Sequence, residues 1–199
     1  MSYKKSAKCL TDAQIRAVLH FLSEHRHPLR NRLIFLLSVK SGLRAKEISD
    51  LKWEMVLDSD GEVSTSIHLT DTASKGTSGR VIPMNRELRE ELIRYRESIR
   101  YSQYQSKWQP WVITTDRSSK TSSQTIINMF RTWYLKLGFL GCSSHSGRRT
   151  FITRSARKIS MVGGSLRDVQ YLAGHSNLQT TQKYIEYDTD SQKRIVDVI

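Results

Sequence analysis

The segment over residues 28–41 constrains the fold of this 199-residue chain more than any other. Its apolar side chains recur at helical spacing but cover more than a single stripe: Leu29, Leu33, Ile34, Leu36 and Leu37. A surface helix needs only one apolar stripe, so this breadth predicts a helix that is buried on most sides. Gly42 follows at once and is expected to end the helix in a left-handed conformation.

Further helical patterns surround one short stretch with strand patterning. Thr11 and Gln14 form a capping box before a first helix, and the final third of the chain is expected to be helical. Between residues 55 and 83 the apolar period changes to two, and Pro83 closes a second short strand. The length fits one compact domain. We therefore expect a mixed α+β fold, mainly helical.

The charge of the chain points to a polyanionic partner. Thirty-two Lys and Arg residues stand against nineteen Asp and Glu, a formal net charge of +13. A merely basic soluble protein would share this composition, so charge alone does not decide. The longest apolar runs are too short to span a membrane, and no signal peptide is evident. Cys9 and Cys142 are expected to be reduced thiols, and no metal site is expected.

Residues 143–184 concentrate reactive side chains near glycine-punctuated helices: His145, Arg148, His175 and Tyr184. Two imidazoles, a guanidinium and a phenol are the groups needed to hold a phosphodiester and attack it. Arg44 lies at a helix entrance, where a cation opposes the helix dipole unless an anion binds nearby. Its simpler interpretation is a surface arginine paired with Glu47. Lys75 lies in a flexible hairpin tip, either as a solubilising residue or as a contact that moves in on binding.

The order of these motifs along the chain resembles the catalytic domain of the tyrosine recombinases, also called the phage integrase family. The resemblance runs from about Leu10 to Tyr187. It is carried by the segment 42–48, by a lysine before Arg-Val-Ile-Pro at 80–83, by His-x-x-Arg at 145–148, by Leu-Ala-Gly-His-Ser at 172–176 and by Thr-Thr-x-x-Tyr at 180–184. It implies that family's fold, with a small antiparallel sheet of about three strands.

The resemblance assigns a role to each matching residue. Arg44 and Arg148 would grip the non-bridging oxygens of one phosphate, and Tyr184 would attack its phosphorus to give a 3′-phosphotyrosyl intermediate. Lys75 would protonate the leaving oxygen, His145 would assist proton transfer at the tyrosine, and His175 would hydrogen-bond the phosphate. Glu47 would orient these groups without reacting. No metal, ATP or other cofactor is implied.

Family membership also implies partners and an assembly. Double-stranded DNA would be bound with help from Lys46, Arg80, Lys120 and Arg149. We expect a tetramer on DNA, accessory DNA-bending proteins, and a cytoplasmic, nucleoid-associated location. Residues 1–199 would form one catalytic domain with tails at 1–10 and 188–199. The second tail is expected to dock on a neighbouring copy. The family's N-terminal core-binding domain is expected to be absent, either because the sequence is a catalytic-domain fragment or because it is a short natural form that resembles the fimbrial phase-switch invertases.

Two alternatives remain beside a site-specific recombinase: a type IB topoisomerase-like enzyme, and a DNA-binding regulator whose catalytic site is not used.

The chain also departs from the family pattern at Gly147, where a larger apolar residue is usual, and this change is expected to loosen local packing.

Overall fold

The computed structural model describes residues 7–73, 78–100, 109–116, 118–184 and 196–197. Within these ranges the chain forms the α-helices α1 (Asp12–Ser23), α2 (Pro28–Ser41), α3 (Ala45–Ser49), α4 (Arg86–Arg100), α5 (Ser123–Lys136), α6 (Ser146–Lys158), α7 (Leu166–Ala173) and α8 (Leu178–Gln182). Short 3-10 helices lie at Trp53–Met55, Asp71–Ala73 and Ile159–Val162. Two strands complete the fold, β1 (Ser66–Leu69) and β2 (Arg80–Pro83).

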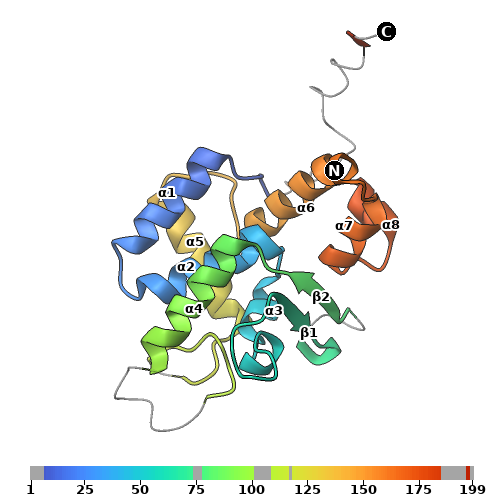
Figure 1. The fold of residues 1–199 in the computed structure, drawn as a ribbon. Helices are drawn as coiled ribbons and strands as arrows, with labels where there is room; N and C mark the ends of the chain where they lie inside the picture. Colours follow the sequence, from blue (N-terminus) through green and yellow to red (C-terminus); the bar gives the residue numbers. More distant parts are fainter. Residues whose placement is uncertain (1–6, 74–77, 101–108, 117, 185–195, 198–199) are drawn as a thin grey trace.

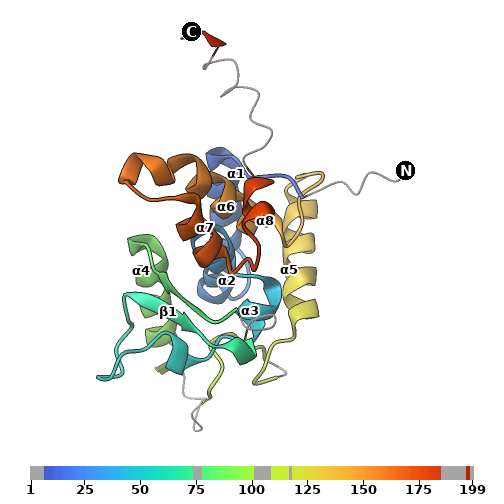
Figure 2. The same ribbon diagram turned by 90° about the vertical axis from the view of Figure 1, so that its right-hand side faces the viewer.

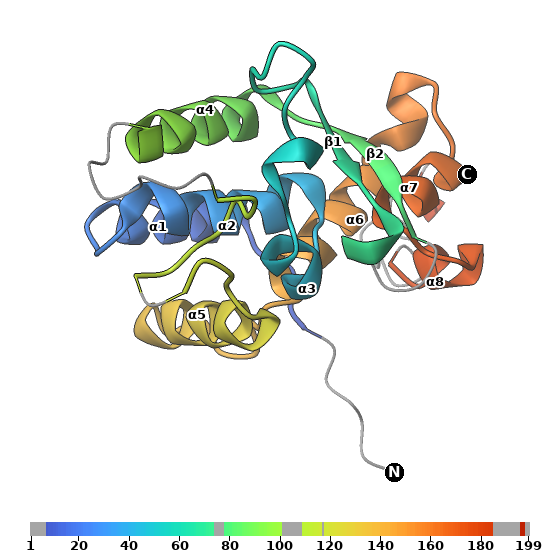
Figure 3. The same ribbon diagram turned by 90° about the horizontal axis from the view of Figure 1, so that it is seen from below.

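Helix α2 is the centre of the molecule, as its sequence predicts. The side chains of residues 33–37 are 0% exposed, and α1, α4 and α6 all pack against the helix. Helices α4 and α5 lie on opposite sides of it (Figures 2 and 3). Gly42 ends α2 with φ at 68°, and a Cβ atom there would lie 2.5 Å from the Phe151 ring. Only glycine combines that conformation with so close a neighbour.

The first helix confirms its predicted cap. The Thr11 hydroxyl accepts from the Gln14 backbone, and the Gln14 side chain accepts in return from the Thr11 backbone. Residues Ile15, Val18 and Leu22 are buried on the inner face of α1. Local sequence alone therefore sets both the start and the packing face of this helix.

The sheet has two antiparallel strands in the described part of the chain, rather than about three. Ile67 pairs with Ile82, and both point into the core. Val63 belongs to the alternating sequence pattern but forms only an isolated bridge with Leu57. The chain turns back on itself here, because the Ser64 N–H donates to the carbonyl of Val56. This local turn uses the hydrogen bonds that a longer strand would need.

Apolar packing divides into a large and a small cluster. The large cluster contains residues from all five helices α1, α2, α3, α4 and α5 and from both strands of the sheet. The small cluster has four buried residues from α6 and α7, against which Tyr184 packs: Ile152, Ala156, Val169 and Ala173. Figure 1 shows α7 and α8 on the far side of α6 from α1 and α5. The apolar packing around Tyr184 thus comes from α6 and α7.

Gly147 tightens the contact between α6 and α2 instead of loosening it. A Cβ atom at Gly147 would lie 2.4 Å from Oγ of Ser38 on α2. The expectation of loose packing at this position is therefore wrong, because a side chain at Gly147 would overlap the Ser38 side chain. No helix in the described residues combines the length and apolar character needed to cross a membrane.

Candidate active site

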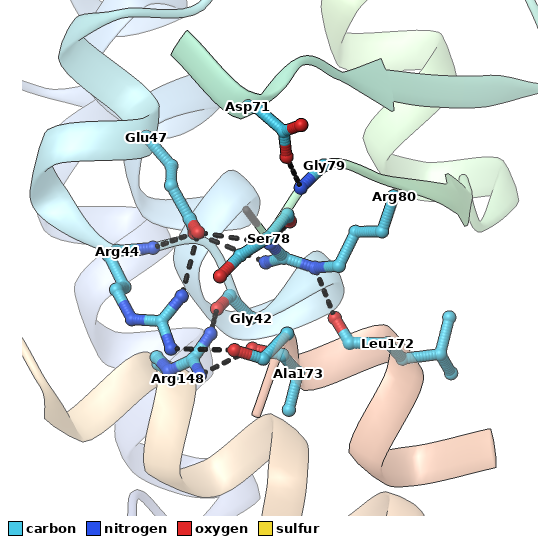
Figure 4. Close-up of polar contacts among 11 residues, drawn as sticks. Gly42, Arg44, Glu47, Asp71, Ser78, Gly79, Arg80, Arg148, Leu172 and Ala173 are labelled. Carbon is cyan, nitrogen blue, oxygen red and sulfur yellow. Dashed lines mark hydrogen bonds and ion pairs between the residues drawn. The ribbon is translucent and has the colours of Figure 1, made fainter. Parts of the chain in front are cut away.

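A buried carboxylate stands at the centre of the site (Figure 4). The Glu47 side chain is 1% exposed and accepts from two guanidinium groups. Arg44 Nη1 donates to it at 2.8 Å, and both terminal nitrogens of Arg80 donate at 3.0 and 3.2 Å. Burial by itself raises the pKa of Glu47, but the bonds from Arg80 and Arg44 outweigh it and hold that pKa below its usual value. Glu47 is therefore a fixed negative charge between two arginines.

The C-terminal end of α7 is held by three arginines from three other elements. Their guanidinium groups donate to three successive carbonyls, at 2.8, 2.6 and 3.2 Å: Arg80 to Leu172, Arg148 to Ala173, and Arg44 to Gly174. The last carbonyls of a helix lack partners within it and carry the negative end of its dipole. Guanidinium groups are favourable there, and they fix the loop that begins at His175.

Arg148 is nearly enclosed. It is 4% exposed, and its second donor goes to the carbonyl of Gly42 at 2.6 Å. Burial and then the charge of Arg44 lower the pKa of Arg148 to about 10, so it remains a cation at neutral pH. A charge this deep in the protein acts through a low local dielectric, and its attraction for an anion is stronger than at the surface.

Arg44 matches the simpler interpretation of its sequence position and also borders a cavity. It pairs with Glu47, as the simpler interpretation requires, and it also lines a cavity of about 910 Å³ with His175. Its side chain is 25% exposed, whereas that of Arg80 is 1% exposed. Arg44 is therefore the more accessible member of the pair bound to Glu47.

His175 and Tyr184 lie next to each other. Their rings stack with centroids 5.8 Å apart, and His175 Nδ1 bonds to the Thr181 hydroxyl at 2.9 Å. Burial, followed by the charges of Arg148, Arg44 and Arg80, lowers the pKa of His175 to about 4. The imidazole is thus neutral at physiological pH. When the Thr181 hydroxyl donates to Nδ1, Nε2 carries the proton and is a hydrogen-bond donor.

His145 lies at the exposed start of α6. Desolvation, and then the nearby charges of Arg148 and Arg44, lower its pKa. The lowered pKa keeps this imidazole neutral at pH 7, when it can accept a proton. The influence of both arginines also shows that His145 belongs to the same electrostatic environment as His175.

The remaining expected residues differ in their surroundings. Lys75 lies outside the described residues, but Ser78 and Gly79, which follow it, line the cavity. Arg149 lies over the Tyr184 ring at 5.5 Å, and Lys46 is exposed on α3. Lys120 lies near the C-terminal end of α3, whereas Arg44 lies at the N-terminal end. Lys120 pairs with Asp50 at 2.9 Å and lies over the Trp111 ring at 4.1 Å.

A DNA contact by Arg80 stays a prediction, and the structure shows a second role for this residue. All of its described bonds go to the protein, namely to Glu47, to the carbonyl of Leu172 and to that of Ser78. Its guanidinium holds β2, α3 and α7 together. No local sequence signal marks this role, because Glu47 and Leu172 lie 33 and 92 residues away from Arg80.

Sequence reasoning also missed Gln170, whose side-chain amide donates to the His175 carbonyl at 3.0 Å. Gln170 and the three arginines therefore fix the backbone on both sides of Gly174. Among the described residues, no group of three or more His, Cys, Asp or Glu is placed to hold a metal ion.

Comparison with known proteins places this arrangement in a family. Tyrosine recombinase XerA of Pyrococcus horikoshii is 28% identical over 197 residues, which are 98% of this chain and 62% of that protein. Tyrosine recombinase XerC of Bacillus pumilus is 29% identical over 169 residues, 83% of this chain and 52% of that protein. The chain thus spans less than two thirds of the length of these curated relatives.

Solved structures share the fold. The crystal structure of XerA recombinase superposes with a TM-score of 0.74 at 23% identity, over 94% of this chain and 63% of that one. XerH site-specific recombinase, bound to a palindromic difH substrate in a post-cleavage complex, gives 0.76 at 19% identity, over 99% and 54%. The sequence model described as "Phage integrase family" matches residues 8–190. This chain belongs to the phage integrase family.

Proposed function

We propose that this chain is the catalytic part of a site-specific recombinase, which cleaves a DNA strand through Tyr184 and rejoins it. The observation that carries the proposal is the convergence of four groups from separate elements: Arg44, Arg148, His175 and Tyr184. The names of the relatives, and the DNA complexes described for XerH and other structural neighbours, support DNA as the substrate.

The guanidinium and imidazole groups of the site suit a phosphate that gains charge. In the transition state of phosphoryl transfer, negative charge is spread over the non-bridging oxygens. Arg44 and Arg148 provide fixed positive charge, and the neutral His175 provides a hydrogen bond from Nε2. The bonds to Glu47 and to the end of α7 orient these donors before substrate arrives, which reduces the reorganisation that the reaction requires.

The covalent step forms a bond between the Tyr184 phenolic oxygen and phosphorus and breaks the bond from phosphorus to the 5′ oxygen. The phenolic proton passes to neutral His145, and the leaving oxygen takes a proton from Lys75. The phosphotyrosyl ester keeps the energy of the broken bond, so the reverse attack by a 5′-hydroxyl rejoins the strand. A free tyrosine, with a pKa near 10, is a weak nucleophile at neutral pH, which is why it needs the base and the adjacent cations.

The test is covalent capture on nicked suicide DNA drawn from the region that flanks this protein's gene. We expect a protein–DNA adduct on a denaturing gel for the wild type and none for Tyr184→Phe. Tyr134→Phe is the matched control, because it removes a buried hydroxyl on α5 that has no hydrogen-bond partner among the described residues and leaves the nucleophile intact. An adduct that persists in Tyr184→Phe contradicts the assignment of the nucleophile. A wild type that binds DNA but forms no adduct favours the regulator.

Strand exchange separates the recombinase from a topoisomerase-like enzyme. A recombinase transfers the cut strand to a second defined site, whereas a topoisomerase-like enzyme relaxes supercoils and reseals the original strand.

We also propose a tetramer on DNA, helped by accessory DNA-bending proteins and associated with the nucleoid, in which residues 188–199 dock on a neighbouring copy. Deleting these residues should reduce strand exchange and leave covalent capture intact, and normal exchange would overturn the docking proposal.

A further inference from the structure

Arg167 is a cation in the same cavity as Arg44 and His175, and the chemistry proposed above does not use it. It lies in the first turn of α7 and is exposed. Within the described ranges, no hydrogen bond or ion pair joins its guanidinium to the protein. By contrast, Arg80 of the same cavity gives all its described bonds to protein groups, and Arg44 shares its donors between Glu47 and a carbonyl.

The position of Arg167 is unfavourable for the helix that carries it. The first turn of an α-helix has unpaired N–H groups and the positive end of the dipole, so a cation there is repelled. In α7 that end is stabilised by the capping box of Ser165 and Asp168, in which the carboxylate accepts from the Ser165 N–H at 2.7 Å. Arg167 therefore does not serve the cap, and its exposed side chain can meet a ligand that enters the cavity.

The cavity offers that ligand both space and additional donors. Its volume is about 910 Å³, larger than a single phosphate group requires, and its wall continues from Arg44 and His175 to Arg167. The exposed hydroxyl-bearing residues Ser176 and Thr180 also line it. A guanidinium fork with nearby hydroxyls is a common arrangement for binding phosphate oxygens.

We propose that Arg167 binds a DNA backbone phosphate next to the scissile phosphate on the same strand. The inference rests on the proposed function, which places the scissile phosphate at Arg44, Arg148 and His175. Phosphates of one strand follow one another at about 3.4 Å along the helix axis, so a cavity that continues from the scissile site meets a neighbouring phosphate. This contact positions the strand and does not take part in bond making or breaking.

The first measurement is equilibrium binding of the whole chain to duplex DNA across a salt series. Each neutralised phosphate contributes about 0.9 to the slope of log affinity against log salt. We expect Arg167→Ala to lower the slope by about that amount, and Arg167→Lys to retain it. Arg16→Ala is the matched control, since Arg16 is an exposed arginine on α1 outside the cavity lining. An equal slope for Arg167→Ala and Arg16→Ala overturns the proposal.

A second measurement locates the phosphate. Replacing one phosphate at a time with an uncharged methylphosphonate, on either side of the cleavage site, should abolish the affinity difference between wild type and Arg167→Ala at one adjacent position only. A difference that survives at both adjacent positions overturns the placement. Single-turnover cleavage by Arg167→Ala should fall at subsaturating DNA, in step with its weaker binding, and a loss that saturating DNA does not reverse would mean that Arg167 acts in the chemistry.

These results are independent of the covalent-capture test. If capture fails but the slope falls in Arg167→Ala, the phosphate contact is supported and the catalytic proposal is not. If capture succeeds and the slope is unchanged, the catalytic proposal is supported and the Arg167 contact is rejected.

Discussion

The two sides of the site differ in how they are supported. The arginine side rests on the large apolar cluster, where Leu43 and Ile48 flank Arg44 and are both 0% exposed. The nucleophile side rests on the small cluster of four buried residues, and Tyr184 itself is only partly buried. Stability within a protein varies with local burial, so the phosphate-binding groups are held more firmly than the nucleophile.

The connection between the two sides is polar. Arg44 and Arg80 reach from the large cluster, and Arg148 reaches from α6, to the terminal carbonyls of α7. Gln170 holds the His175 backbone. We therefore distinguish a firmly packed phosphate clamp, formed by Arg44, Arg80 and Arg148 with Glu47, from a less firmly packed nucleophile. The following variants test that distinction, in order of decreasing expected effect.

Removing Arg80 should be the most damaging single change to the clamp. Arg80→Met leaves the Glu47 carboxylate buried with one partner fewer, and breaking such a pair costs about 3–5 kcal/mol of the free energy of unfolding. The measurement is urea unfolding. Arg86→Met is the control, because Arg86 is 92% exposed in its pair with Glu90 and should cost at most about 1 kcal/mol. Similar costs for the two variants would show that the Glu47 network does not support the clamp.

Filling the close contact between α6 and α2 should have the next largest effect. Gly147→Ala places a methyl group 2.4 Å from Ser38 Oγ, and overpacking of this kind costs about 1–3 kcal/mol. In a Ser38→Gly background the same substitution should cost much less, because the opposing side chain is gone. The test is the free energy of unfolding of the wild type, of each single variant and of the double variant. Additive costs of the two substitutions would exclude the steric explanation.

The small cluster can be weakened without touching the large one. Val169→Ala and Val18→Ala each truncate a valine that is 0% exposed, at a cost of about 1–2 kcal/mol. We expect only Val169→Ala to accelerate hydrogen exchange over residues 166–184 and to slow adduct formation. Equal exchange in the two variants would mean that the two clusters unfold as one unit.

Acid should destabilise the wild type about as much as the truncation of one buried valine does, because each unit of pKa difference corresponds to about 1.4 kcal/mol. The pKa of His175 is about 4 in the folded chain, below the value of about 6.5 expected for the unfolded chain. As pH falls from about 6.5 to about 4, the unfolded state binds a proton that the folded state does not, so stability declines over that window. His175→Gln should lose less stability than the wild type between about pH 7 and pH 5, and an equal loss in the two proteins would contradict this prediction.

Much of the fold follows from local sequence because its signals are local. The capping box of Thr11 and Gln14, the turn at Gly42 and the apolar breadth of residues 28–41 act within a few residues, and the structure matches each prediction. The strand pattern from Val63 overestimated the sheet. Alternation describes which side chains are buried, but the turn between Val56 and Ser64 takes backbone hydrogen bonds that a strand would use.

The sequence by itself determined the helices, their caps and the reactive residue types in their order, because these depend on spacing along the chain. Only the tertiary structure decided what each cation does. It buried Arg80 against Glu47, opened Arg44 to the cavity and left Arg167 without a partner among the described residues. The three side chains are chemically identical. Their roles differ because burial and long-range partners, which no local pattern encodes, determine whether a guanidinium serves the fold or a ligand.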